Sequence, residues 1–162
     1  MEPNDLTHAG QELRGGGVAL IPTDTVYGLA AAADDTAAVA SMFAMKQRSV
    51  DVQVAVLVAD VEQARQFVDL GPIGEALAER YWPGPLTIVA PRHVAGSLAA
   101  GDDETLGVRC PDDAVARALA ADVGPIAATS ANLHGKATPT RAAEAAQLFP
   151  GVRIVLDDGP RP

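Results

Sequence analysis

Ile21-Pro22-Thr23-Asp24-Thr25-Val26-Tyr27-Gly28-Leu29 joins a short apolar run to a cluster of polar groups. The run 18–21 is typical of a buried strand, and Pro22 ends it because proline cannot donate a ladder hydrogen bond. Hydroxyl, carboxylate and phenol groups follow before Gly28, which allows close backbone approach or an unusual dihedral angle. Open α/β sheets bind ligands at strand ends, so the stretch indicates a site. An ordinary polar turn is the alternative.

A second stretch repeats this design later in the chain. The apolar run 126–129, a predicted strand, leads directly into Ser130-Ala131-Asn132, and Gly135 follows. Hydroxyl and amide groups at the end of a strand again indicate a site. An Asx or Ser turn explains the same residues without one.

Two cations follow the helix predicted to begin near the cluster Asp34-Asp35-Thr36 and to end near Lys46. Its apolar residues recur at i, i+3 and i+4, as in an amphipathic helix with an N-cap. Lys46 and Arg48 could merely offset the helix dipole and face water. We instead expect them to turn towards the 23–27 loop and hold an anion, because arginine suits bidentate contacts and lysine acts as a point charge.

Length and composition favour one globular domain covering residues 1–162. The chain has 162 residues, of which 48% are apolar and 20% charged. Its net charge of -9 argues against non-specific adhesion to nucleic acid or anionic membranes, but not against an anionic small molecule. No apolar run reaches about 18 residues, and the first residues lack a basic region leading into an apolar one. The sequence therefore predicts a cytoplasmic protein without a membrane span.

The remaining pattern alternates helices and strands. Further strands are predicted at 53–58, 86–90, 105–109 and 152–156, and further helices at 6–14, 60–68, 73–80, 114–121 and 140–148. Thr140 is the expected N-cap of the last helix. Residues 91–104 are the least patterned and predict a mobile surface loop, and residues 157–162 read as a polar tail.

Other chemistry-bearing residues are given structural interpretations. Gly15-Gly16-Gly17 precedes a strand and lacks the Lys-Ser/Thr tail of a phosphate loop, so it predicts a flexible joint. Cys110, the only cysteine, is expected to be a buried structural thiol rather than a nucleophile. The histidines show no metal-ligand spacing and are expected in solvated loops; they are His8, His93 and His134.

Five short motifs occur in order at sensible spacings. They are Pro22–Leu29, Lys46-x-Arg48, Trp82-Pro83-Gly84-Pro85-Leu86-Thr87, Val108-Arg109-x-Pro111 and Ser130-x-Asn132. Together they resemble the YrdC-like threonylcarbamoyl-AMP synthase family, over about residues 18–159. The resemblance implies a single α/β domain, a twisted mixed sheet with flanking helices and a large concave ligand cavity.

The resemblance also implies an activity. Members of the family condense L-threonine, bicarbonate or CO2 and ATP to threonylcarbamoyl-AMP and pyrophosphate, with Mg2+ accompanying ATP. The product supplies the N6-threonylcarbamoyl group of adenosine 37 in tRNA, through downstream tRNA-modifying transferase proteins. An indirect link to tRNA follows, and no link to a membrane.

Site residues are carried over by position. Lys46 and Arg48 are expected to be catalytic, holding carboxylate and phosphate groups. Thr25, Arg109 and Ser130 are expected to bind threonine. Arg48, Thr105, Asn132 and Thr140 are expected to contact the nucleotide, and no protein metal ligand is expected. The chemistry agrees, because adenylation builds up negative charge that fixed cations and hydroxyl donors stabilise, and it requires no covalent nucleophile.

The chain departs from the family pattern in two places. Ser49 and Val52-Gln53-Val54 stand where the family commonly has Pro and Asn-Pro-Leu. The change removes an expected nucleotide contact and is expected to loosen the loop that aims Arg48. The sequence also ends at Pro162, before the Ser-Thr-containing strand and late arginine with which family members usually close over their ligands. We therefore expect either a pocket completed differently or a shortened, impaired relative.

Two other functions fit the pattern less well. One is a non-catalytic RNA-binding or ribosome-associated module, which the net charge and the absence of a basic aromatic stripe disfavour. The other is an enzyme that adenylates a different carbamoyl or carboxyl compound.

Overall fold

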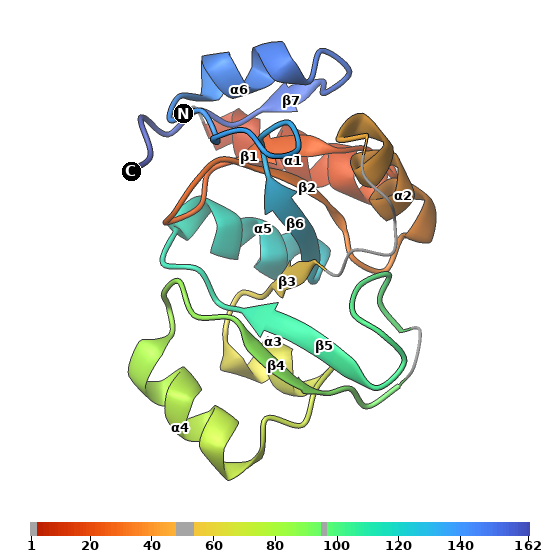
Figure 1. Cartoon of the computed structure of the whole chain (residues 1–162), viewed down its shortest axis with the longest axis vertical. Coiled ribbons are helices and arrows are strands. Elements are labelled where there is room, and N and C mark those ends of the chain that lie inside the picture. The colour runs from red at the N-terminus through yellow and green to blue at the C-terminus, as the bar shows by residue number, and fades with distance from the viewer. Residues whose placement is uncertain (1–2, 48–53, 95–96) are drawn as a thin grey trace.

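A seven-stranded mixed sheet with helices on both faces forms the protein (Figure 1). The computed structural model describes residues 3–47, 54–94 and 97–162. The strands are β1 (Ala19–Ile21), β2 (Gly28–Ala32), β3 (Ala55–Leu57), β4 (Ile88–Pro91), β5 (Thr105–Arg109), β6 (Ile126–Ser130) and β7 (Ile154–Val155). The helices are α1 (Pro3–Arg14), α2 (Thr36–Met45), α3 (Val61–Arg65), α4 (Gly71–Tyr81), α5 (Ala114–Val123) and α6 (Ala142–Leu148).

The strand order β4-β5-β3-β6-β2-β1-β7 places the two polar junctions side by side. β1 and β2 form an antiparallel hairpin, so residues 22–27 are its connecting loop. β2 in turn pairs antiparallel with β6. β3 pairs parallel with β5 and antiparallel with β6, which makes the sheet mixed, as expected from the sequence.

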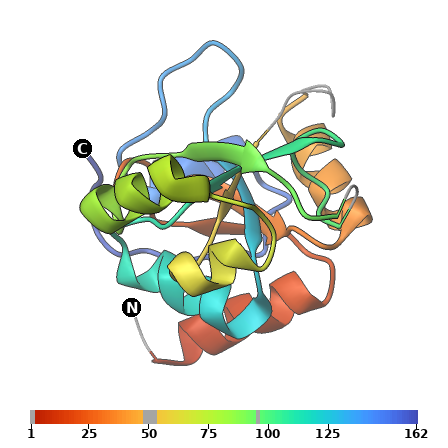
Figure 2. The ribbon, with the colours of Figure 1, turned by 90° about the horizontal axis from the view of Figure 1, so that it is seen from below.

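Alternate residues of β1 and β2 fill two separate cores. Ala19, Ile21 and Ala30 pack with α1 and α5, whereas Leu20 and Leu29 belong to the larger core that includes α2 and α6. Because successive side chains of a strand point to opposite faces, α1 and α5 cover one face of these strands and α2 and α6 the other. Figure 2 shows α1 and α5 lying together on one side of the sheet.

Helix starts follow the predicted caps with one exception. Asp35 accepts a hydrogen bond from the Ala38 N–H at 2.9 Å, and Asp113 accepts one from Ala116 at 2.9 Å. The prediction that Thr140 caps the last helix was wrong. Arg141 is the N-cap residue of α6 and makes no capping bond through its side chain.

The 91–104 segment is organised around Arg92, which the prediction of a mobile loop missed. The Arg92 guanidinium donates to the carbonyl oxygens of Leu98, Ala100 and Asp102 at 3.1, 2.8 and 2.6 Å. Hydrogen bonds to a charged donor are worth about 1.5–3 kcal/mol each. Composition alone does not reveal such a centre, because the acceptors are backbone groups.

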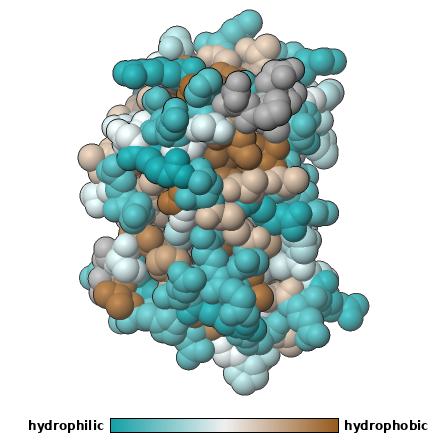
Figure 3. All heavy atoms as spheres, turned by 180° about the vertical axis from the view of Figure 1, so that it is seen from behind, coloured by the Kyte–Doolittle hydropathy of each residue, from teal (hydrophilic) through white to brown (hydrophobic). Residues whose placement is uncertain are grey.

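Hydrophilic side chains dominate the rear surface, with hydrophobic residues showing between them (Figure 3). Among the described residues, no helix combines the length and apolarity that crossing a bilayer requires.

Candidate active site at the paired strand ends

The hydroxyl loop (Thr23–Val26) and the Ser130–Asn132 junction meet at one edge of the sheet. Gly28, the first residue of β2, pairs with Ser130, the last residue of β6. The Ala131 N–H extends this contact by donating to the Tyr27 carbonyl oxygen at 2.8 Å. A Cβ atom on Gly28 would lie 3.2 Å from the Thr129 carbonyl oxygen, so a side chain here would crowd the backbone of β6.

The two threonines of the hydroxyl loop have different roles. Thr23 is buried, its hydroxyl donates to the Val26 carbonyl oxygen at 2.7 Å, and it accepts from the Val26 N–H at 3.2 Å. It therefore closes the turn through local side-chain bonds. Thr25 is half-buried, and its hydroxyl lies 3.2 Å from that of Thr23 and 3.3 Å from an Arg109 nitrogen. Thr25 thus lies between the hydroxyl loop and the Arg109 guanidinium.

Lys46 points into the Ser130–Asn132 junction. It is the C-cap residue of α2 and only 3% exposed. Its ammonium donates to the Ser130 carbonyl oxygen at 2.6 Å, to Asn132 Oδ1 at 3.0 Å and to the Thr129 hydroxyl at 3.2 Å. A lysine that merely offset the dipole of α2 would face water, so that alternative is wrong for Lys46.

The target of Lys46 differs from the expected one. The sequence predicted that it would turn towards the 23–27 loop, whereas these three hydrogen bonds go to β6 and the junction that follows. The Ser130 hydroxyl also donates to Asn132 Oδ1, at 2.6 Å. The lysine therefore fixes the amide orientation of Asn132, because an ammonium group can only donate.

Arg109 supplies the second cation of the site and is half-buried. Its guanidinium forms an ion pair with Asp24, and the two side chains are 14% and 11% exposed. Arg109 also donates through Nε to the Gly84 carbonyl oxygen at 3.2 Å. The guanidinium is thus held on both sides, by the hydroxyl loop and by the turn that contains Gly84.

A cavity of about 90 Å³ lies between these groups. Its lining is Thr23, Thr25, Val26, Gly28, Ala55, Leu57, Arg109, Ala128, Thr129 and Ser130. Ligand pockets usually measure roughly 300–1,000 Å³, so this cavity suits a small polar molecule rather than a whole nucleotide. The large concave cavity expected from the resemblance stays a prediction.

Comparison with known proteins adds to this geometry. The Sua5/yciO/yrdC family, described as "Telomere recombination", matches residues 11–162. This chain belongs to that family. The threonylcarbamoyl-AMP synthase of Pyrococcus abyssi is 38% identical over 151 residues, which cover 91% of this chain and 44% of that protein. A putative threonylcarbamoyl-AMP synthase of Mycobacterium tuberculosis (strain H37Rv) is 37% identical over 151 residues, covering 91% of this chain and 70% of that protein.

Solved structures agree with the family assignment. The crystal structure of P. abyssi Sua5 complexed with L-threonine superposes with a TM-score of 0.87 at 36% identity, covering 99% of this chain and 48% of that one. The chain therefore spans less than half of the P. abyssi protein and about two thirds of the mycobacterial one. The single-domain Sua5/yciO/yrdC fold expected from the sequence is confirmed.

The remaining carried-over residues lie in different places. Thr105 shares a sheet face with Arg109 but sits four residues away along β5, roughly 13 Å at 3.3 Å per residue. The registers of β3 with β5 and β6 align Thr105 with the Ser130 end of the sheet, two strands away. Its hydroxyl donates to Asp102 at 3.1 Å. Thr105 is thus separated from the cavity beside Arg109, although both residues lie on the same face of the sheet.

Thr140 lies in the segment before α6, and Arg48 lies outside the described residues. Thr140 is exposed in the segment before α6, where its carbonyl oxygen accepts from the Arg161 N–H at 2.8 Å. Arg48, together with Ser49, Val52 and Gln53, lies outside the described residues. The expected roles of Thr140 and Arg48 stay predictions.

Sequence reasoning assigned no role to Asp24 or Gly84, which hold Arg109. Asp24 stands between two threonines that were singled out, so its place in the motif was a usable signal. Gly84 acts through its carbonyl oxygen, which no side-chain pattern reveals.

The described residues do not form a protein cage for a metal ion. No group of three or more His, Cys, Asp and Glu side chains among them is arranged to hold one. The Asp24 carboxylate forms an ion pair with Arg109.

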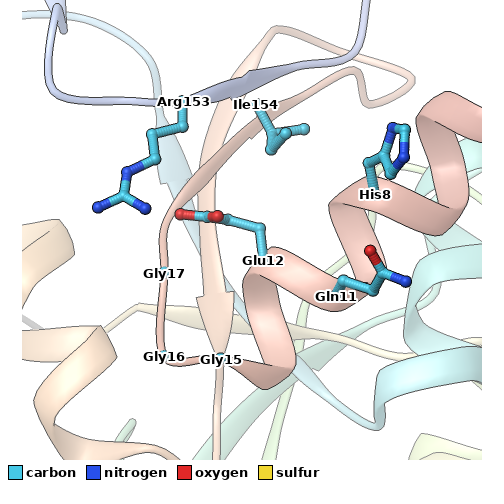
Figure 4. Close-up of a pocket in the computed structure, with 8 residues that line it drawn as sticks. All are labelled: His8, Gln11, Glu12, Gly15, Gly16, Gly17, Arg153 and Ile154. Carbon is cyan, nitrogen blue, oxygen red and sulfur yellow. The ribbon is translucent and has the colours of Figure 1, made fainter.

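The triple glycine lines a separate cavity of about 530 Å³ beside α1 (Figure 4). The N–H groups of Gly15, Gly16 and Gly17 donate to carbonyl oxygens of the last turn of α1, at 2.9, 3.1 and 2.9 Å. They are not available to a phosphate, and the C-terminal end of a helix repels anions. The Glu12 carboxylate also reaches towards this cavity (Figure 4). These contacts agree with the interpretation that the triple glycine is not a phosphate loop, and its flexibility stays a prediction.

Cys110 is a buried thiol, as expected. It is 3% exposed and donates to the Ala59 carbonyl oxygen at 3.4 Å, and burial raises its pKa. Since the thiolate is the reactive form, we expect native protein to resist 5,5'-dithiobis(2-nitrobenzoate) at pH 8. The same reagent should label one thiol per chain after unfolding in guanidinium chloride. Rapid labelling of the native protein would contradict the assignment.

Proposed function

We propose that this chain is the catalytic domain of an L-threonylcarbamoyladenylate synthase. It would condense L-threonine, bicarbonate or CO2 and ATP to threonylcarbamoyl-AMP and pyrophosphate. The observation that carries the proposal is the meeting of Thr25, Arg109 and Ser130 around one small cavity, with the buried Lys46 ammonium bonded to the Ser130 carbonyl oxygen beside it. The relatives that bear this name, one of them solved with L-threonine, support it.

Threonine is the substrate that suits the 90 Å³ cavity. Its carboxylate would take the outer face of the Arg109 guanidinium, and its hydroxyl would meet Thr25 or Ser130. Asp24 balances the charge of Arg109 and lies near the expected position of the amino group. Hydrogen-bond partners on several sides of a small substrate give strong discrimination against analogues that lack a hydroxyl.

The chemistry needs positioning and charge stabilisation rather than a protein nucleophile. The threonine nitrogen bonds to the carbon of CO2 and loses a proton, giving a carbamate. A carbamate oxygen then attacks the α-phosphorus of ATP, and the bond to pyrophosphate breaks. Negative charge builds up on the phosphoryl oxygens, which fixed cations and hydrogen-bond donors stabilise.

Lys46 would act from beneath the Ser130–Asn132 junction. Three oxygen atoms already surround its ammonium group, so in this conformation it holds the junction together. A phosphate oxygen would have to replace one of them, and Asn132 Oδ1, at the end of a side chain, is the partner that can move. The nucleotide would lie outside the small cavity, on the face of the sheet that carries Ser130 and Thr105, with Mg2+ on its phosphates.

Small side chains lie beside these two residues on the same face of the sheet. The registers of β3 with β5 and β6 place Ala55 level with Ala128 and Gly107, one row along from Ser130 and Thr105. Small residues leave room above a sheet for a ligand to approach closely. A cytoplasmic location, downstream transferase proteins and an indirect link to tRNA belong to the same proposal.

Pyrophosphate release tests the proposal. Purified protein would be incubated with ATP, Mg2+, bicarbonate and each amino acid in turn. We expect release that requires L-threonine and bicarbonate together. Release with another carboxyl compound only would assign a different acyl substrate, and no release with any compound would contradict catalysis by this chain.

A further inference from the structure

Residues Asp157–Arg161, here called the strap, hold the hydroxyl loop from outside through Tyr27. Tyr27 follows the loop directly, and its side chain is completely buried. Its hydroxyl donates to the Gly159 carbonyl oxygen at 2.6 Å and accepts from the Asp158 N–H at 3.2 Å. Burial raises the pKa of this phenol, so it stays a hydrogen-bond donor at neutral pH. The sequence predicted only a polar tail here.

Arg161 links the strap to Asp113 and to Tyr27. Its guanidinium pairs with Asp113 at 2.9 Å and Asp158 at 3.1 Å and lies 5.7 Å from the centroid of the Tyr27 ring. The Asp113 side chain is 6% exposed and also caps α5. An arginine between a buried carboxylate and an aromatic face combines an ion pair with a cation–π contact.

These contacts are not what a purely stabilising tail would need. The Nε atom of Arg161 is buried without a hydrogen-bond partner among the described residues, which is uncommon and costs stability. The same guanidinium is nevertheless placed against the residue that joins the hydroxyl loop to β2. Tyr27 also carries the backbone contact to Ala131 in the Ser130–Asn132 junction. Tyr27 therefore connects Arg161 to both the hydroxyl loop and the Ser130–Asn132 junction. Arg161 itself is not among the residues that line the cavity.

We propose that Arg161 is a positioning residue for the site: acting through Tyr27, it sets the hydroxyl loop so that Thr25 meets Arg109 in the geometry that receives the amino-acid substrate. The substrate part of this inference rests on the function proposed above. The mechanical part, that the strap orders the loop, stands on its own.

Hydrogen exchange tests the mechanical part without any substrate. The N–H groups of Thr23, Thr25 and Val26 are all bonded within the loop, at 3.1–3.3 Å. In Arg161→Met and Tyr27→Phe we expect exchange in a peptide covering residues 22–29 to quicken about tenfold, with exchange in β6 unchanged. Arg161→Lys should restore part of the protection. The matched control is Arg153→Met, at an exposed arginine next to β7.

Steady-state kinetics test the substrate part. In Arg161→Met we expect the KM for L-threonine to rise about tenfold while the KM for ATP changes less than twofold. Equal rises in both constants, or faster exchange throughout the chain, would mean a general structural role and would overturn the proposal. So would unchanged exchange in the 22–29 peptide. If wild-type protein releases no threonine-dependent pyrophosphate, the proposed function fails, and the exchange data still decide whether the strap orders the loop.

Discussion

Replacing Lys46 with alanine is expected to lower the kcat/KM of threonine-dependent pyrophosphate release by about a thousandfold, at the upper end of what one transition-state donor contributes. The substitution removes the charge beneath the junction and frees three acceptors, on Thr129, Ser130 and Asn132. Asn132 and the Ser130 hydroxyl then lose their fixed orientation. The measurement is steady-state kinetics with L-threonine and ATP varied separately.

Stability must be followed in parallel, because Lys46 is buried. Lys46→Met keeps the length of the side chain and separates loss of charge from loss of packing. Lys136, the other lysine of the chain, is exposed in the loop after Asn132. Lys136→Ala should leave kcat/KM within about twofold, since exposed substitutions rarely perturb a site. An active Lys46→Met variant with a native circular dichroism spectrum would contradict the role given to Lys46.

Replacing Arg109 with glutamine is expected to destabilise the protein by about 3–5 kcal/mol and to abolish threonine-dependent turnover. The loss of stability follows because Asp24 would keep a largely buried charge without its partner. Urea unfolding measures this effect, and the pyrophosphate assay measures turnover.

The double variant Asp24→Asn/Arg109→Gln separates the two effects. Removing both charges should recover most of the stability, because no unpaired charge is left, but should not recover turnover. As a control, Arg65→Gln breaks two exposed ion pairs, with Glu62 and Glu75, and it should leave the unfolding midpoint nearly unchanged. If the double variant regained activity, the Arg109 guanidinium would not be a substrate contact.

Much of the fold could be predicted from local pattern. Strand β5 was predicted as residues 105–109, with the bounds observed. β2 was missed, because its sequence Gly28-Leu29-Ala30-Ala31-Ala32 is buried on both faces and lacks both alternation and β-branched residues. Helix α6 begins two residues later than predicted. No side chain caps its first turn, so the sequence carries no signal for where it starts.

The residues of the site could be predicted from the sequence, but the contacts between them could not. The sequence identified the hydroxyl loop, Lys46, Arg109 and the Ser130–Asn132 junction, and the structure brings these together. It could not show that Lys46 turns to Asn132 rather than to the hydroxyl loop. Nor could it show that residues 157–161 hold Tyr27 from 130 or more positions away. Such contacts depend on strand order, which a one-dimensional pattern does not contain.

A crystal structure of this protein with L-threonine and a non-hydrolysable ATP analogue would test the central claim most directly. The account predicts threonine in the cavity between Thr25 and Arg109, with its carboxylate on the guanidinium, and phosphate groups above Ser130. Ligands bound instead in the cavity beside α1, or an Arg109 that contacts only Asp24 while threonine is bound elsewhere, would contradict it.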